Sequence, residues 1–336
     1  GIYSLEKGKT SYTSNSGLME LREEIRNYLI RKLNVQYNPK NEMIITVGGS
    51  EGIDIALRAM LDKDDEVLIP QPSYVSYEPC TILAGGKPVI IELKAEDGFK
   101  LKASQILEKI TDKTKILILP FPNNPTGSIL NIEELKEIAK VCIKKDLYVI
   151  SDEIYCELTY EGEHASIVQI EGMKERTVLI NGFSKSYAMT GWRLGYATGP
   201  KEIIAQMTKI HQYAIMCAPT TSQYAAVEAL MHGDADVARM RESYNQRRRY
   251  LLYRFEEIGM TCFEPQGAFY VFPSIKKFNM SSEEFATRLL EEQKIAIVPG
   301  TAFGESGEGY VRVSYAYSME RLKEALSRIE KFVRSL

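Results

Sequence analysis

The sequence predicts an α/β protein in which a mostly parallel sheet, sandwiched by helices, is joined to a smaller α+β domain. Between residues 41 and 200, short apolar runs alternate with segments of helical periodicity. This rhythm is typical of parallel strands that are buried on both faces and covered by helices. After Pro200 the pattern changes to long helical stretches, and from Ala268 it changes again to a shorter alternation of strands and helices. The change predicts a second, smaller domain.

The larger part is predicted strand by strand from its apolar runs. Strands are expected at 43–47, 66–69, 89–93, 115–119, 147–151, 177–180 and 194–198. The segments between them carry apolar residues at helical spacing, as Ile53, Ala56 and Leu57 do after the first strand. Asn131 and Glu134 form a capping-box pattern that predicts the start of another helix. Such one-sided helices are expected to pack on the sheet.

The smaller domain is predicted from the remaining segments. Long helices are expected within 201–258, followed by strands at 268–272, 295–298 and 311–315. Ser281 predicts a helix cap, and a final helix places Leu322, Leu326 and Ile329 on one stripe. An amphipathic helix near the N-terminus, which contains Leu21, is expected to pack with this domain.

Composition narrows the classes of function. The 336 residues include 42 basic and 45 acidic side chains, a formal charge of −3, so bulk attraction to nucleic acid or to a membrane is not expected. The hydrophobic share of 44% excludes global disorder. Five cysteines without a C-x-x-C pair and three scattered histidines predict reduced thiols, no metal site and a cytoplasmic location. No apolar run reaches the length of a membrane span.

The first motif, Gly48-Gly49-Ser50-Glu51-Gly52, follows a predicted strand and opens a helix. Glycines permit a close approach of the backbone, and a helix N-terminus offers free N–H groups to an anion. The motif is neither a dinucleotide fingerprint nor a Walker loop. It is equally compatible with a structural turn and with a phosphate cradle.

Two further motifs end predicted strands. The run 121–127 is a proline-rich turn that holds Asn123 and Asn124, and the run 151–155 holds Asp152 and Tyr155. Open α/β sheets bind ligands at the carboxyl ends of their strands, although a rigid turn is the simpler interpretation of the first run. Asp152 is compatible with cation binding, helix capping, or pairing with a buried positive nitrogen.

The last two motifs contain basic residues among apolar ones. Lys185 lies in the run 181–193 and is either a surface lysine or a desolvated amine able to attack a carbonyl. Arg193, in the same run, could bind a phosphate through two N–H groups. Arg312 interrupts an apolar strand. It is expected either on the solvent face or buried against a carboxylate.

In this order the five motifs resemble those of the fold-type I, pyridoxal-phosphate-dependent aminotransferases of class I/II. The stretch 184–196 resembles the branch of bacterial and archaeal aspartate and aromatic aminotransferases. The sequence is also similar to bacterial aminotransferases acting on acetylated diaminopimelate. The resemblance implies a seven-stranded sheet in a large cofactor-binding domain at 41–235 and a small C-terminal domain at 236–336. Residues 1–40 are expected to form the N-terminal part of the small domain or a dimer arm. Relatives carry a further N-terminal segment, which is expected to complete the substrate site.

The resemblance also implies catalytic roles. Lys185 would be the Schiff-base lysine and the base that moves the substrate proton. Asp152 would pair with the pyridine nitrogen and keep the ring an electron sink. Asn124 and Tyr155 would bond the ring's phenolic oxygen, and Tyr74 would stack on the ring.

The same resemblance implies how phosphate and substrate are held. The phosphate ligands would be Gly49, Ser50, Ser184 and Arg193, with Tyr12 reaching the partner subunit's site in a homodimer. Arg312 would clamp the substrate α-carboxylate, with Asn124 and Tyr74 beside it. Tyr12, Tyr74, Ile154 and the 215–216 neighbourhood are expected to line the side-chain pocket.

The expected reaction is a ping-pong transfer of an amino group between an L-amino acid (aspartate, aromatic or diaminopimelate-type) and a 2-oxo acid. A lyase or decarboxylase on the same fold is the alternative enzyme, since a fold does not determine a reaction. A non-catalytic cofactor-sensing domain is the alternative outside catalysis. A nicotinamide-dependent dehydrogenase fits the strand–helix rhythm but lacks its glycine fingerprint.

Overall fold

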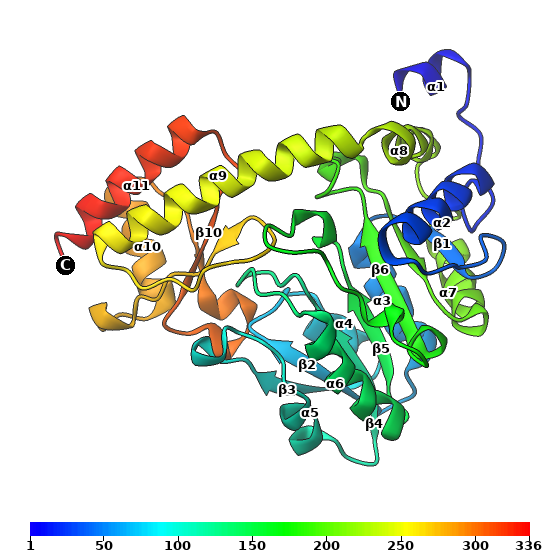
Figure 1. Ribbon diagram of the computed structural model, residues 1–336, viewed down its shortest axis with the longest axis horizontal. Helices are drawn as coiled ribbons and strands as arrows, with labels where there is room; N and C mark the ends of the chain where they lie inside the picture. The colour runs from blue at the N-terminus through cyan, green and yellow to red at the C-terminus, as the bar shows by residue number, and fades with distance from the viewer.

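The centre of the molecule is a seven-stranded sheet, seen in a computed structural model that describes residues 1–336. Its strands are β1 (Met43–Thr46), β2 (Glu66–Gln71), β3 (Lys87–Glu92), β4 (Thr114–Leu119), β5 (Tyr148–Asp152), β6 (Thr177–Gly182) and β7 (Gly195–Thr198). They lie in the order β1-β7-β6-β5-β4-β2-β3. All seven fall within a residue or two of the predicted runs, and the fold class is confirmed (Figure 1).

One strand runs against the others. The pairs β2–β3, β2–β4, β4–β5 and β5–β6 are parallel, whereas β7 is antiparallel to both β1 and β6. The chain goes from β6 to β7 through residues 183–194, which contain no α-helix to carry it back along the sheet. A parallel crossover usually needs such a helix, so the chain returns in the opposite direction. This return places residues 183–194 at one end of the sheet.

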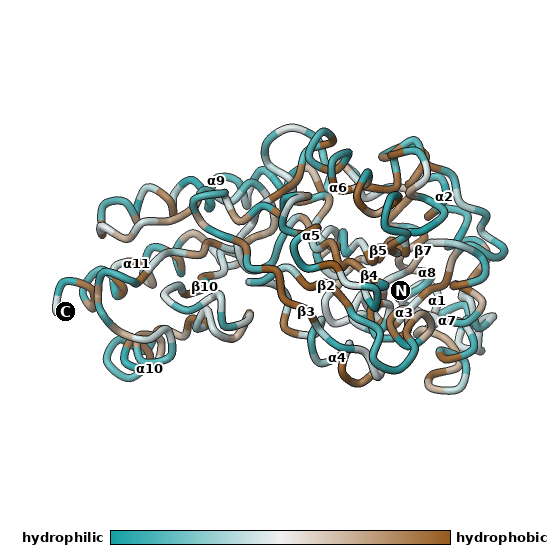
Figure 2. Tube along the Cα trace, turned by 90° about the horizontal axis from the view of Figure 1, so that it is seen from below, coloured by the Kyte–Doolittle hydropathy of each residue, from teal (hydrophilic) through white to brown (hydrophobic).

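Helices cover both faces of the sheet because its strands are apolar on both sides. Ile116 and Ile118 share a core with α3 (Gly49–Met60), α4 (Tyr77–Leu83) and α7 (Lys201–Ala214). Leu117 and Leu119 share the opposite core with α5 (Ala103–Lys109), α6 (Ile132–Lys144) and α8 (Thr220–His232). Alternate side chains of a strand point to opposite faces. Figure 2 shows the hydrophobic strands enclosed in this way.

The N-terminal helix does not pack where we expected. In α2 (Met19–Leu33), Leu21, Ile25 and Leu29 are buried in the same core as the sheet residue Leu117, beside α8. The backbone N–H of Leu18 also donates to Gln223 of α8 at 2.7 Å. Periodicity predicted the apolar face of this helix, but the face covers the large sheet rather than the smaller domain. The short helix α1 (Ile2–Glu6) also lies against α8.

The smaller domain is built around a three-stranded antiparallel sheet in the order β8-β10-β9. Its elements are α9 (Asp234–Ile258), β8 (Tyr270–Val271), α10 (Ser282–Gln293), β9 (Val298–Pro299), β10 (Val311–Ser314) and α11 (Met319–Val333). Their apolar faces form a separate core that includes Phe285, Leu289 and Phe332. The long helix α9 extends from beside α8 to the C-terminal helices (Figure 1).

Two predicted helix starts are confirmed. Asn131 accepts from the N–H of Glu134 at 2.9 Å, and the Glu134 carboxylate accepts from the N–H of Asn131 at 2.8 Å. Ser281 accepts from the N–H of Glu284 at 3.1 Å. These bonds satisfy N–H groups that a helix start leaves free.

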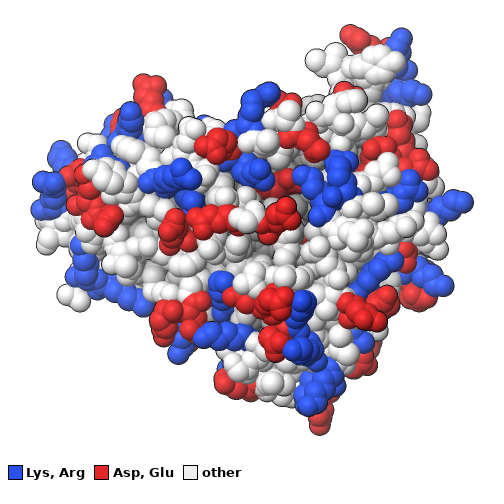
Figure 3. All heavy atoms as spheres, viewed as in Figure 1, with Lys and Arg blue, Asp and Glu red and all other residues white.

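The outer surface is mixed in charge. Lysine and arginine side chains are interspersed with acidic ones over the face shown in Figure 3. None of the helices combines the length and the apolar character that crossing a membrane would require.

Candidate active site

A cavity of about 270 Å³ opens at the carboxyl ends of β4, β5 and β6, facing the small domain. Its lining residues include Gly49, Ser50, Tyr74, Asn124, Asp152, Tyr155, Ser184, Lys185, Arg193 and Arg312. The structure therefore brings together every residue for which a catalytic, cofactor-binding or carboxylate-binding role was predicted, except Tyr12. Tyr12 lies outside the cavity and is 78% exposed.

Asp152 is a buried carboxylate at the end of β5. Its Oδ2 accepts from the hydroxyl of Tyr77 at 2.7 Å, and its Oδ1 accepts from the N–H of Ile154 at 3.2 Å. Burial raises the pKa of Asp152 above its ordinary value, although the hydrogen bonds and the charge of Lys185 act in the opposite direction. A cationic group in the cavity would offset the cost of this buried charge.

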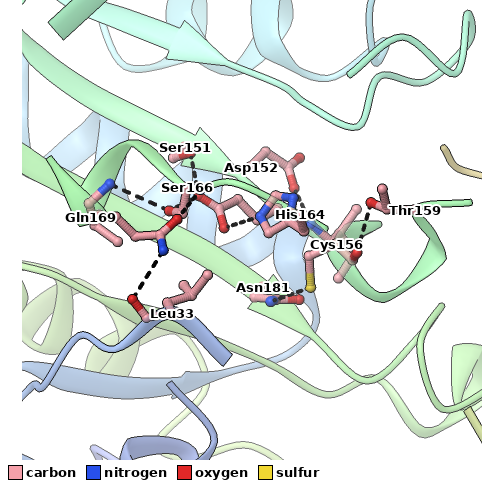
Figure 4. Close-up of polar contacts among 12 residues, drawn as sticks. Leu33, Ser151, Asp152, Cys156, Thr159, His164, Ser166, Gln169 and Asn181 are labelled. Carbon is pink, nitrogen blue, oxygen red and sulfur yellow. Dashed lines mark hydrogen bonds and ion pairs between the residues drawn. The ribbon is translucent and has the colours of Figure 1, made fainter. Parts of the chain in front are cut away.

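The neighbouring residue, Glu153, belongs to a separate buried network. Its carboxylate accepts from Ser151 at 2.8 Å and from Ser166 at 2.5 Å, and it lies 2.7 Å from Nε2 of His164. Figure 4 shows Ser151, Ser166 and His164 gathered at the end of β5, beside Asp152. With its carboxylate held by three partners, Glu153 anchors the backbone that presents Asp152 to the cavity.

Lys185 follows β6 and is half-buried. Its Nζ lies 5.5 Å from the ring centroid of Phe269 and 5.9 Å from that of Tyr155, so aromatic faces replace much of its water. Burial, followed by the charges of Arg312 and Arg193, lowers the pKa of the Lys185 amine. A lowered pKa increases the neutral fraction, which is the nucleophilic form.

One corner of the cavity is suited to an anion. Helix α3 begins at Gly49 with free backbone N–H groups, and Gly48 has a φ of +81°. A Cβ added to Gly48 would lie 2.8 Å from Nη2 of Arg193, so glycine accommodates both the left-handed backbone and the present position of the guanidinium. The hydroxyls of Ser50 and Tyr74 are 3.1 Å apart in the same corner.

Arg312 occupies the small-domain side of the cavity. Its Nη1 donates to Oδ1 of Asn124 at 2.8 Å, while its guanidinium carbon lies 4.2 Å from the ring centroid of Tyr270 and 4.7 Å from that of Phe303. Its buried Nε has no hydrogen-bond partner. Both alternatives expected for Arg312 are wrong, because it lies between aromatic rings rather than on the solvent face or against a carboxylate.

Several lining residues were missed by the sequence reasoning, notably Tyr77 and Tyr270. Tyr77 follows Tyr74 by three residues, a spacing that could have indicated a shared site. Tyr270 lies in a predicted strand, where alternation alone does not distinguish a core residue from a cavity residue. Ile154 lines the cavity as expected, whereas Ile215 and Met216 do not.

Comparisons with known proteins agree with this geometry. Residues 4–329 match the family model described as aminotransferase class I and II. The chain is 46% identical over 330 residues to a Bacillus subtilis (strain 168) protein named "Probable N-acetyl-LL-diaminopimelate aminotransferase", covering 98% of this chain and 83% of that relative. It is 45% identical over 334 residues to the aspartate aminotransferase of Pyrococcus abyssi, covering 98% and 86%.

Solved structures show the same likeness in three dimensions. The aromatic aminotransferase from Pyrococcus horikoshii OT3 superimposes with a TM-score of 0.97 at 43% identity, over 99% of this chain and 90% of that one. Sequence and fold therefore point to the same group of proteins.

Proposed function

The chain belongs to the class I and II aminotransferases, and on that premise we propose that it binds pyridoxal phosphate through Lys185 and moves an amino group between an L-amino acid and a 2-oxo acid. The proposed mechanism is ping-pong, and the proposed donors are aspartate, an aromatic amino acid or a diaminopimelate-type amino acid. One observation carries the proposal: Lys185, Asp152, Asn124 and Arg312 line a single cavity.

The cavity fits the cofactor in three respects. The start of α3 and Arg193 provide an anion corner for the phosphate, kept open by the absence of a Cβ on Gly48. Asp152 is a buried carboxylate that a pyridinium nitrogen would neutralise. The Nε of Arg312 is buried without a partner, as expected of a clamp whose ligand is a carboxylate.

When bound, pyridoxal phosphate supplies a ring that accepts the electron pair left by proton removal at the substrate α-carbon. Lys185 is the proposed base: its Nζ would receive that proton and later release it, so that one residue serves as both base and acid. Burial lowers the pKa of the Lys185 amine, which increases the fraction in the neutral, proton-accepting form.

The other residues orient the reactants. Asp152, whose carboxylate accepts a hydrogen bond from Tyr77, would hold a positive nitrogen in the cavity. Arg312 binds the α-carboxylate, and Asn124 fixes the angle of its guanidinium. Tyr155 and Asn124 offer polar atoms toward the ring oxygen. Burial raises the pKa of Tyr155 well above its usual value, so its hydroxyl stays protonated and can donate.

We further propose a homodimer with shared sites. Tyr12 is exposed and outside its own chain's cavity, and the neighbouring residues Ile2, Tyr3 and Leu5 are also exposed. Exposed apolar side chains of this kind near the N-terminus favour contact with a second subunit. Tyr12 is the proposed ligand of the partner's phosphate.

An optical experiment tests the proposal. Protein loaded with pyridoxal phosphate is expected to show a visible absorption band that shifts when amino donors are added, with fresh 2-oxo acid restoring it. A panel of aspartate, phenylalanine, tyrosine and N-acetyl-diaminopimelate ranks the donors. A loaded parent protein without a visible band would overturn the cofactor assignment. Product formation that needs no 2-oxo acid would instead favour a lyase or decarboxylase.

A further inference from the structure

Tyr270 is a buried tyrosine of β8 whose ring and hydroxyl contact two different residues of the site. We propose that it is a positioning residue with two separable roles: its ring orients Arg312, and its hydroxyl orients Tyr155. The inference rests on the proposed function and adds a residue to it.

The ring role follows from how Arg312 is held. The guanidinium lies 4.2 Å from the Tyr270 ring centroid, and Phe303 provides a second aromatic face at 4.7 Å. The only side-chain hydrogen bond of Arg312 goes to Asn124, and no acidic residue pairs with it. Attraction to the ring faces therefore replaces a carboxylate partner and leaves the remaining N–H groups free for a substrate carboxylate.

The hydroxyl role follows from the contact with Tyr155. The two hydroxyl oxygens are 3.0 Å apart, and both side chains are buried. Each hydroxyl has one proton to donate. If Tyr270 donates to Tyr155, the Tyr155 proton is free to point at a ring oxygen in the cavity. Donation from Tyr270 also makes Tyr155 a stronger donor, because linked hydrogen bonds polarise one another.

Other groups near the pair come from several elements. Asp152 of β5 raises the pKa of Tyr155 and Arg312 of β10 lowers it, and Nζ of Lys185 lies 5.9 Å from the Tyr155 ring centroid. Tyr74 lies close enough to Tyr270 to raise its pKa, and Tyr270 in turn raises the pKa of Tyr244 in α9. The Tyr270 hydroxyl has no hydrogen-bond partner other than Tyr155. A change confined to that hydroxyl therefore acts through Tyr155.

Two substitutions separate the roles. Tyr270→Phe keeps the ring and removes the hydroxyl. We expect it to bind the unreactive carboxylates maleate and 3-phenylpropionate within about twofold of the parent, while the pKa of the lysine–cofactor linkage rises by about half a unit to one unit. Tyr270→Leu removes both features. We expect it to show the same pKa rise and about tenfold weaker carboxylate binding.

The measurements use the loaded protein and do not depend on turnover. Absorption of the bound cofactor is followed against pH, and carboxylate binding is measured by calorimetry. A double-mutant cycle with Tyr155→Phe provides the decisive control, since removal of the Tyr270 hydroxyl should have no further effect on the linkage pKa once Tyr155 has lost its own. Tyr253→Phe, on the exposed part of α9, should match the parent.

Each outcome supports or contradicts the inference. An unchanged linkage pKa in Tyr270→Phe, or the same rise in the Tyr155→Phe background, overturns the hydroxyl role. Equal carboxylate binding by parent and Tyr270→Leu overturns the ring role, and Tyr270→Met replaces that variant if it fails to fold. A parent that takes up no cofactor contradicts the proposed function itself. A parent that takes up cofactor but binds neither carboxylate contradicts the clamp assigned to Arg312 and, with it, the ring role.

Discussion

The guanidinium of Arg312 donates a 2.8 Å hydrogen bond to Oδ1 of Asn124, although the two residues are 188 positions apart in the sequence. Asn124 follows β4 of the large sheet, and Arg312 lies in β10 of the small one. The bond therefore joins the two parts of the molecule across the cavity. A substrate carboxylate bound there would contact both parts at once.

Replacing Arg312 by lysine tests this clamp. A lysine has one point charge, no planar fork and no stacking face, so we expect KM for the amino donor to rise by about 10- to 100-fold with a smaller change in kcat. Steady-state kinetics on the loaded enzyme measure both constants. Arg321→Lys, on the exposed start of α11, should leave them unchanged. An unaltered KM in Arg312→Lys would contradict the proposed clamp.

Replacing Lys185 by alanine removes the proposed nucleophile and base together. We expect the absorption of lysine-linked cofactor to disappear and activity to fall by about 10⁴-fold or more. Lys209→Ala provides the control, because Lys209 is exposed on α7 and bonds only to Gln206. Absorption spectra and turnover of the two variants are compared. Retention of the parent spectrum in Lys185→Ala would show that another group holds the cofactor.

Replacing Asp152 by asparagine is expected to lower turnover without lowering the stability of the cofactor-free protein. Burial makes the folded carboxyl bind its proton more tightly than the unfolded one, so the stability of cofactor-free protein falls as pH rises through the interval between the two pKa values. Asparagine removes this dependence; its Oδ1 can still accept from the N–H of Ile154, while its Nδ2 can donate to the hydroxyl oxygen of Tyr77. Cofactor-free Asp152→Asn should therefore have a Tm at pH 7 equal to or above that of the parent, with a strong loss of turnover.

Thermal unfolding of cofactor-free protein across pH measures the effect. Asp112→Asn, at an exposed position, should retain the pH profile of the parent. A lower Tm for Asp152→Asn at pH 7 would show that the carboxylate stabilises the empty site.

His211 contacts the anion corner indirectly, through Glu51 in the first turn of α3. Its Nδ1 lies 2.6 Å from Oε1 of Glu51, whose other oxygen accepts from the N–H of Val47 at the turn into α3. His211 is fully buried, so His211→Ala would leave Glu51 without this partner and should cost about 1–3 kcal/mol of unfolding free energy. We also expect weaker cofactor binding, because Glu51 lies in the first turn of α3.

A matched histidine controls for that result. His232 lies 3.9 Å from Glu228 in an exposed pair, and His232→Ala should change stability by less than about 0.5 kcal/mol. Denaturant unfolding and cofactor titration of the two variants are compared. Equal losses of unfolding free energy and of cofactor affinity in both variants would contradict the role assigned to the buried His211–Glu51 pair.

Mixing chains of two impaired variants tests the shared site. In a homodimer whose sites combine Lys185 of one chain with Tyr12 of the other, hybrids of Lys185→Ala and Tyr12→Phe chains contain one intact site. Random exchange of subunits should then restore about a quarter of the parent activity. Without exchange each variant stays impaired. Failure to restore activity in mixed dimers verified by mass would place Tyr12 outside the partner's site.

The sequence by itself determined the elements and the faces they bury. Apolar runs located the seven strands of the large sheet, and the caps at Asn131 and Ser281 marked helix starts, because these signals depend on neighbours within a few residues. The strand-end motifs also indicated which side chains would share a cavity, since the carboxyl ends of parallel strands meet at one edge of a sheet.

Only the tertiary structure decided which surfaces and which polar atoms meet. The apolar face of α2 could have covered either domain, and it covers the large sheet. Likewise, Tyr77 meets Asp152, Tyr270 meets Tyr155, and Arg312 lies between two rings instead of against an acid. Except for the contact of Arg312 with Phe303, nine positions away, these contacts join residues far apart in the chain, and their geometry depends on how whole elements pack. Local periodicity specifies that a side chain is buried, but it does not specify which distant group it meets there.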